Sequence, residues 1–136
     1  MIDGNTLLIA HLGYPTTSFK APLIYNPYFD HIGVNAAVIP MGVKPGAFEG
    51  FVAALFKLSN VRGALVTMPH KVNALSVVDQ SSPTAQIAGA CNAILLRPDG
   101  TLAGDMFDGE GFVRGVLRKG RAVAGARALV VGSGGV

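Results

Sequence analysis

Residues 63–71 of the sequence, Gly-Ala-Leu-Val-Thr-Met-Pro-His-Lys, decide the fold. The apolar first half predicts a short buried strand, which Pro69 ends because proline has no N–H for a sheet and suits the first turn of a helix. Open α/β sheets bind ligands at the carboxyl ends of their strands, so Thr67, His70 and Lys71 lie where a ligand is expected. From this stretch alone, the simpler interpretation of Lys71 is a solvated lysine at a helix start.

Length and composition are those of one apolar domain. The 136 residues can bury a sizeable core, half of them are hydrophobic, and the mean hydropathy is +0.45. No apolar run reaches the ~20 residues that span a bilayer and no signal-peptide pattern begins the chain. We therefore expect a cytoplasmic protein with no membrane partner.

The charged residues and the single cysteine exclude several kinds of site. The net charge is +3, but basic residues are scattered until a cluster at 114–121, so no nucleic-acid partner is expected. Cys91 has no partner for an internal disulfide and is interpreted as a small core residue. No Cys and His residues have metal-ligand spacing, so no metal site is predicted.

Apolar runs and helical spacing alternate along the chain and predict an α/β fold. Pro27 should kink or split its helix, and Ser82 and Asp108 are predicted N-caps. The helix after Asp108 is expected to bury Phe112, Val116 and Leu117. The predicted strands are 6–13, 35–40, 64–68, 92–97, 101–107 and 127–131, and the predicted helices are 22–31, 47–58, 69–75, 83–88 and 108–117.

A glycine-rich turn, residues 132–135, directly follows the predicted strand 127–131. This is how a dinucleotide-binding unit opens, because glycines permit a tight turn and close approach to a pyrophosphate. Gly132, Ser133, Gly134 and Gly135 are therefore candidate cofactor-binding residues. The match is short, since the sequence stops before the helix and the acidic residue that complete such a unit.

Five motifs follow one another along the chain: residues 66–71 (VTMPHK), 89–92 (GACN), 99–104 (DGTLAG), 108–112 (DGEGF) and 130–135 (VVGSGG). In order and spacing they resemble the shikimate/quinate dehydrogenase family. The resemblance implies an open three-layer αβα sandwich with a mostly parallel sheet as substrate-binding domain (residues 1–120). It also implies the first strand and glycine turn of a Rossmann domain (residues 121–136), which binds NADP or NAD.

The resemblance also implies roles for individual residues. Lys71 matches the catalytic lysine of the family and Asp108 its aspartate partner, and the pair would move the proton of the reacting hydroxyl while hydride passes to or from the nicotinamide. Thr67 and Asn92 match positions that hydrogen-bond the substrate. Apart from the resemblance, Lys20 is a further candidate, as a cation that could meet an acid.

Three departures from the family pattern replace polar groups. The family pattern Gly-x-Pro-x-x-His-Ser-x-Ser-Pro aligns with residues 13–22, where Phe19 and Ala21 replace the two serines that bind the substrate carboxylate. Only a one-residue shift would bring Ser18 near the first serine position. The other two departures are Leu65, in place of an asparagine, and residues 106–107 (Met-Phe), in place of Asn-Thr. An unpaired buried polar group costs roughly 1–3 kcal/mol, so a site that has lost such partners should reject the ligand that needs them. The predicted substrate is therefore a cyclic hydroxy acid or polyol, and the protein either prefers one other than shikimate and quinate or handles these two poorly.

Two other functions stay open. One is a binding module that holds a small polyol or acid without chemistry. The other is a lysine-dependent dehydrogenase for folate derivatives, against which residues 108–112 argue. His11 and His31 are interpreted as hydrogen-bonded structural residues, and a homodimer through an edge strand is expected.

Overall fold

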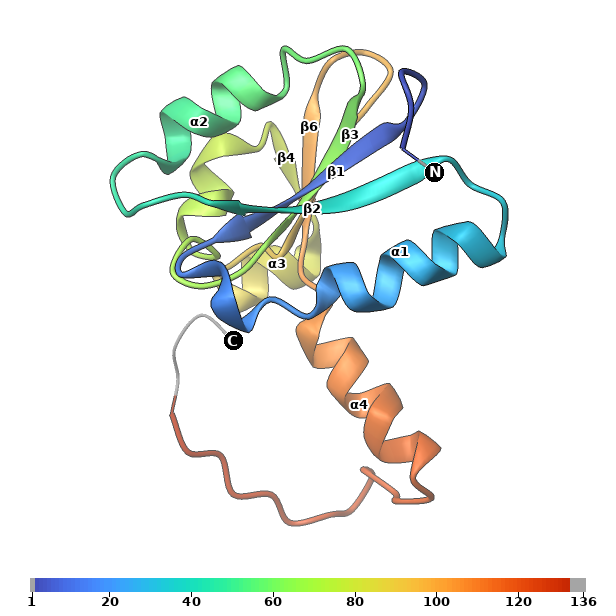
Figure 1. The fold of residues 1–136 in the computed structure, drawn as a ribbon. Coiled ribbons are helices and arrows are strands. Elements are labelled where there is room, and N and C mark those ends of the chain that lie inside the picture. The colour runs from blue at the N-terminus through green and yellow to red at the C-terminus, as the bar shows by residue number, and fades with distance from the viewer. Residues whose placement is uncertain (1, 133–136) are drawn as a thin grey trace.

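The computed structural model describes residues 2–132, which form one sheet with helices around it (Figure 1). Two short 3-10 helices, η1 and η2, accompany the α-helices. The elements in chain order are β1 (Leu7–Gly13), η1 (Thr16–Ser18), α1 (Ala21–His31), β2 (Ala36–Gly42), α2 (Phe48–Leu55), β3 (Val61–Val66), η2 (Asn73–Val77), β4 (Gln80–Ser81), α3 (Pro83–Ala88), β5 (Ala93–Leu96), β6 (Leu102–Asp105) and α4 (Asp108–Arg118).

The described part of the sheet has six strands in the order β2-β1-β3-β5-β6-β4. The pairs β1–β2, β1–β3 and β4–β6 are parallel, and β5 runs antiparallel to both β3 and β6. The predicted α/β fold with a mostly parallel sheet is confirmed. The predicted strands 92–97 and 101–107 form an antiparallel hairpin, β5 and β6, with Asp99 and Gly100 between them.

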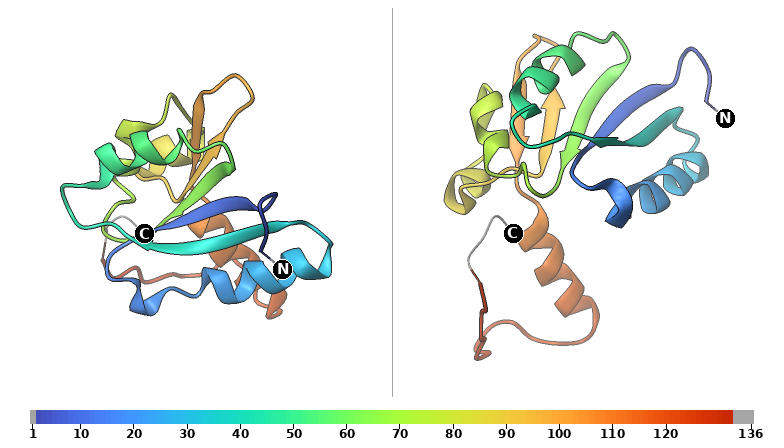
Figure 2. Two further views of the ribbon diagram at one scale, coloured as in Figure 1. Left: turned by 45° about the horizontal axis from the view of Figure 1, so that its top comes forward. Right: turned by 60° about the vertical axis from the view of Figure 1, so that its left-hand side comes forward.

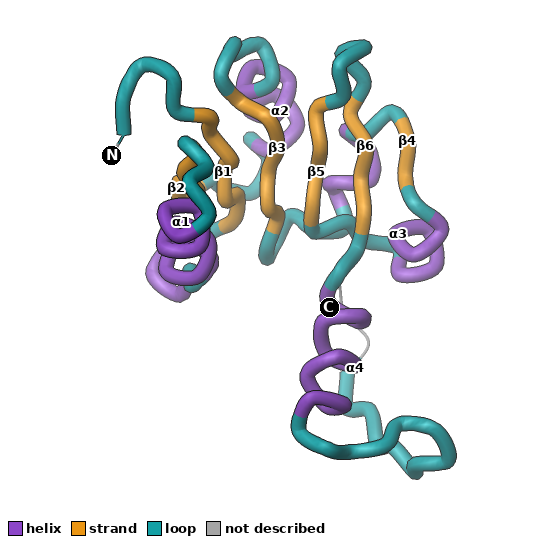
Figure 3. The backbone as a smooth tube through the Cα atoms, turned by 90° about the vertical axis from the view of Figure 1, so that its right-hand side faces the viewer, coloured by secondary structure: helices purple, strands orange, loops and turns teal. Residues whose placement is uncertain are grey.

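One face of the sheet is covered by α2 and carries the main core, as the view in Figure 3 shows. Alternate residues of a strand face the same side, and helical spacing puts Phe48, Val52 and Leu55 on one face of α2. The side chains that face each other from the strands and from α2 form a single buried cluster. Its buried members are Ala10, Leu12, Val43, Phe48, Val52, Leu55, Val61, Ala64, Val66, Ala74, Cys91 and Ile94.

On the opposite face, α1 lies over the edge strand β2 (Figure 3). The Asn26 amide donates to the Val38 carbonyl at 3.2 Å, and the Val38 N–H donates to Asn26 Oδ1 at 2.7 Å. Of the two predicted effects of Pro27, a kink or a split, the split does not occur, because α1 is continuous. The bonds made by Asn26 fix the turn that contains the proline and offset the backbone bond that the proline cannot make.

The outer edge of β2 has few free donors for another strand. The Ala36 N–H donates to the Val34 carbonyl, the Val38 N–H donates to Asn26, and Pro40 has no N–H. Pairing a second chain here would break two of these bonds. A homodimer stays a prediction, and these bonds disfavour its formation by strand addition at β2.

The last helix, α4, projects from the sheet together with the segment that follows it (Figure 2). The prediction that its stripe is buried was wrong, since Phe112 is 73% and Leu117 53% exposed. No described element packs on that stripe. The predicted strand 127–131 is also absent, because no described strand lies beside it to share backbone hydrogen bonds.

The helices of the described residues are all too short or too polar to cross a lipid bilayer.

Candidate active site

The residues around Lys71 form a tight turn at the carboxyl end of β3. The Thr67 N–H donates to the Leu12 carbonyl of β1 at 2.8 Å, and the His70 N–H donates to the Thr67 carbonyl at 3.0 Å. The helix predicted from Pro69 does not form, and a 3-10 helix begins only at Asn73. The turn forms instead because its N–H groups find partners within the loop and on β1.

Lys71 and Asp108 make an ion pair although 37 residues separate them. Lys71 Nζ lies 2.5 Å from Asp108 Oδ2, and the Lys71 side chain is 10% and the Asp108 side chain 34% exposed. The Asn92 amide donates to the other carboxylate oxygen, Oδ1, at 2.6 Å. The structure thus brings three of the predicted site residues into one network.

The backbone holds Asn92 in place from three sides. Its carbonyl accepts from the Val66 N–H at 2.8 Å, its N–H donates to the Asp105 carbonyl at 2.9 Å, and its side-chain Oδ1 accepts from the Phe107 N–H at 3.0 Å. The amide is therefore oriented so that its NH₂ group faces Asp108. Such a fixed donor keeps the carboxylate in one rotamer.

Asp108 is not the N-cap that the sequence predicts. Phe107 occupies the N-cap position of α4, and Asp108 is the first helical residue, with its carboxylate bound to Lys71 and Asn92. In the first turn of α4 its carboxylate is stabilised by the helix dipole. By contrast, the predicted cap Ser82 is confirmed, since its Oγ accepts from the Ala85 N–H at 3.1 Å.

His70 faces the core and not the Lys71 side chain. It is 1% exposed, its ring stacks on Phe48 with centroids 4.6 Å apart, and its Nε2 donates to the Val43 carbonyl at 2.7 Å. A carbonyl can only accept, so Nε2 carries the proton. His70 anchors the turn that positions Lys71.

The loop between β1 and α1 carries the other two predicted substrate residues, Ser18 and Lys20. Both are exposed, and neither side chain hydrogen-bonds to another described residue. Phe19, between them, is half-buried and stacks on His11 with ring centroids 4.1 Å apart. The structure therefore places the phenyl ring against the sheet, while Ser18 and Lys20 stay at the surface.

His11 is buried on β1, with 8% of its surface exposed, and its Nδ1 has no hydrogen-bond partner among the described residues. This differs from the hydrogen-bonded histidine that the sequence predicts. Burial lowers the pKa of His11 from its usual 6.5, because charge is disfavoured away from water. Unfolding at low pH therefore adds a proton to this imidazole.

The pH dependence of stability tests this burial. Below pH 6.5 the unfolded chain binds more protons at His11 than the folded chain, so the contribution of this residue is full above pH 6.5 and is lost as the pH falls. We expect the urea midpoint to fall between pH about 7.5 and about 5.5, and the fall to be smaller in His11→Val. An equal fall of the urea midpoint in the wild type and in His11→Val would contradict a lowered pKa of the buried His11.

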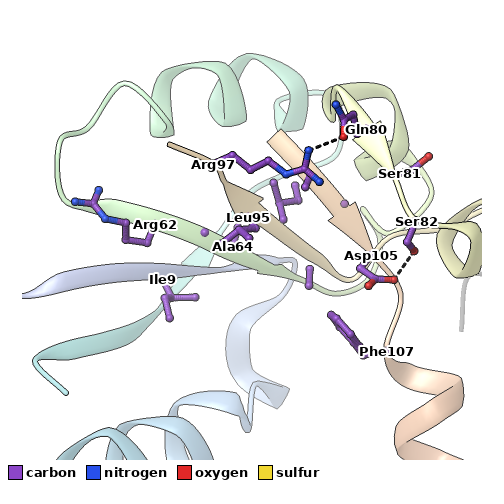
Figure 4. A pocket seen from close by; sticks show the side chains of 15 residues that line it. Ile9, Arg62, Ala64, Gln80, Ser81, Ser82, Leu95, Arg97, Asp105 and Phe107 are labelled. Atoms are coloured by element: carbon purple, nitrogen blue, oxygen red, sulfur yellow. Dashed lines mark hydrogen bonds between the residues drawn. The ribbon is translucent and has the colours of Figure 1, made fainter. Parts of the chain in front are cut away.

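A hollow lies on the open sheet face beside the site (Figure 4). It has a volume of about 480 Å³, an apolar floor that includes Ala64 and Leu95, and Phe107 at one end. Arg97 at its rim is hydrogen-bonded to Gln80 at 2.5 Å. Lys71 does not line this hollow. The hollow and the Lys71–Asp108 ion pair are therefore separate features, which approach each other at Phe107.

Among the described residues there is no metal cluster, and only one of the four predicted cofactor-binding residues, Gly132, is described. No group of three or more His, Cys, Asp and Glu residues among them is arranged to hold a metal ion. Gly132 has the positive φ of 98° typical of a glycine turn, but residues 129–131 before it are 81–90% exposed. Ser133, Gly134 and Gly135, the other predicted cofactor residues, lie outside the described residues.

A comparison with protein families matches residues 12–94 to the shikimate dehydrogenase substrate binding domain. The chain belongs to the shikimate dehydrogenase family. The matched segment includes Lys71 and Asn92, whereas Asp108 follows it.

Individual relatives agree with this family. The chain is 37% identical over 134 residues to the NADP(+) shikimate dehydrogenase of Rubrobacter xylanophilus, covering 98% of this chain and 47% of the relative. The chain thus spans about half the length of the curated relatives it matches.

Two solved structures share the fold. Shikimate dehydrogenase from Thermus thermophilus in complex with shikimate matches 96% of this chain and 49% of its own, with a TM-score of 0.86 and 30% identity. The ligand-free 5-ketofructose reductase of a Gluconobacter strain matches 92% of this chain and 44% of its own, with a TM-score of 0.81 and 26% identity.

Proposed function

We propose that the chain is the substrate-binding part of a shikimate dehydrogenase-like oxidoreductase that uses NADP or NAD. In this proposal residues 1–120 bind a cyclic hydroxy acid or polyol, and residues 121–136 begin the nucleotide-binding part. The observation that carries it is the network of Lys71, Asp108 and Asn92 at the carboxyl end of β3. A cytoplasmic location and a homodimer are further proposals.

The proposed reaction interconverts an alcohol and a ketone. A nicotinamide, when bound beside the site, accepts or supplies the hydride. Oxidation breaks the carbinol C–H and O–H bonds and forms C=O, so the O–H proton must leave to a base. The Lys71–Asp108 pair is suited to accept this proton, because Nζ and the carboxylate share a hydrogen bond and the Lys71 side chain is only 10% exposed.

The neighbouring groups suit the binding of substrate hydroxyls. Thr67 is half-buried on the turn that leads to Lys71, and its hydroxyl can donate and accept. Asn92 is rigidly held and its amide already orients Asp108. Relatives with this fold include enzymes named for shikimate and for 5-ketofructose, which supports an oxygen-rich carbonyl or alcohol substrate.

A binding module without catalysis is the second candidate function. In that function the ion pair would hold a polyol or acid and no hydride would move. The relatives that the chain matches are named as dehydrogenases, so they favour the oxidoreductase.

An activity assay of the complete gene product separates the two functions. Reduction of NADP⁺ or NAD⁺ is followed across a panel of cyclic polyols and hydroxy acids, and binding of the same compounds is followed by calorimetry. We expect turnover of at least one compound with one of the two nucleotides. Binding without any turnover would reject the oxidoreductase and support the binding module.

A further inference from the structure

Phe19 lies beside Thr67 at the carboxyl end of β1. A Cβ atom built at Gly13 would lie 2.4 Å from Thr67 Cγ2 and 2.8 Å from Phe19 Cζ, so the two side chains meet above this glycine. Real Cβ atoms do not approach other atoms so closely. Glycine at residue 13 therefore permits the phenyl ring to sit next to Thr67.

His11 supports the ring from the strand. The two ring centroids are 4.1 Å apart with an interplanar angle of 32°, and His11 itself is buried. Phe19 is only half-buried, so part of this residue remains accessible to solvent. The ring is thus a fixed apolar surface and not a freely moving loop side chain.

The charge of the neighbouring site is already balanced. Lys71 Nζ is 2.5 Å from Asp108 Oδ2, and Asn92, which completes the network, is neutral. A substrate carboxylate would have to compete with Asp108 for this cation. Against Phe19 it would meet the negative face of an aromatic ring and would lose water without gaining a donor.

We propose that Phe19 selects a substrate without a carboxylate, namely an uncharged polyol or ketose. Its C–H face would pack on the phenyl ring while its hydroxyl groups bond to Thr67, Asn92 and the Lys71–Asp108 pair. The inference rests on the proposed function and narrows its substrate class. It makes Phe19 a specificity residue with no part in proton transfer.

Pairs of probes that differ in one charge test this selection. Shikimate is compared with methyl shikimate, and quinate is compared with methyl quinate. 5-ketofructose serves as a ketose probe. We expect kcat/KM to be at least about tenfold higher for each ester than for its acid. The variant Phe19→Ser, which offers a hydroxyl donor and more space, is expected to lower this ratio about tenfold or more.

The variant Phe29→Ser is the matched control, because Phe29 is also half-buried but lies on α1 against Tyr25 and Tyr28. It should leave the ester-to-acid ratio unchanged. If Phe19→Ser fails to fold, the ester-to-acid ratio is measured for the wild type and for Phe19→Leu instead. Both ratios are expected to stay above one, so they still test the selection by Phe19. The Kd values of each acid and its ester, measured on this chain, test the same preference even without turnover.

Two results would overturn the inference and leave the proposed function intact. One is turnover that favours the acids over their esters, whether or not this preference for acids disappears in the variant Lys20→Gln. The other is an ester-to-acid ratio that Phe19→Ser does not change. Loss of all turnover would count against the oxidoreductase, whereas binding that favours the esters would still support the selection by Phe19.

Discussion

Replacing Lys71 by alanine is expected to lower kcat for the substrate by about 10²–10⁴-fold, the usual range for loss of an acid–base group. Asp108→Asn should have a comparable effect, because asparagine keeps the shape and can still accept from Asn92 but carries no charge. Both residues act on the proton that leaves with the hydride. The loss should therefore appear mainly in kcat, with a smaller change in KM.

Steady-state kinetics of the complete gene product measure this, with Lys57→Ala as the matched control. Lys57 is an exposed lysine that follows α2 and has no ion-pair partner among the described residues, so its removal should leave kcat unchanged. Circular dichroism checks that each variant is folded. If Lys71→Ala retained more than about a tenth of the wild-type kcat, the pair would not be the proton-transfer group.

The sequence was most informative where local chemistry decides the structure. Alternating apolar residues predicted the strands, and the Ser82–Pro83 start of α3 was confirmed because an N-cap depends only on neighbouring backbone groups. The order of motifs identified Lys71 and Asp108 as partners. Their meeting at 2.5 Å could come only from the resemblance, since no local pattern links residues 37 positions apart.

The wrong predictions concern residues whose structure depends on distant partners. Asp108 was predicted to be a cap, but Lys71 and Asn92 bind its carboxylate, which no spacing along the chain indicates. The apolar pattern of residues 127–131 predicts a strand, yet a strand forms only beside another one. Phe112 has the helical spacing of a core residue and remains exposed because no described element covers α4.

Phe48→Ala is expected to lower the free energy of unfolding by about 3–5 kcal/mol, the usual cost of removing a buried phenyl ring. Phe48 is 1% exposed in the core beneath α2 and stacks on His70. Domains of this size are stable by only about 5–15 kcal/mol, so the variant should unfold at much lower urea concentration. His70 would lose its stacking partner, and the turn that carries Lys71 would lose part of its support.

Urea unfolding followed by circular dichroism measures the change, and Phe112→Ala is the matched control. The same substitution at a side chain that is 73% exposed should shift the free energy of unfolding by less than about 0.5 kcal/mol. A loss below about 1 kcal/mol in Phe48→Ala would show that the core beneath α2 repacks easily. The position of Lys71 would then depend on the backbone hydrogen bonds of its turn and on the bond from His70 to the Val43 carbonyl, not on the packing of Phe48.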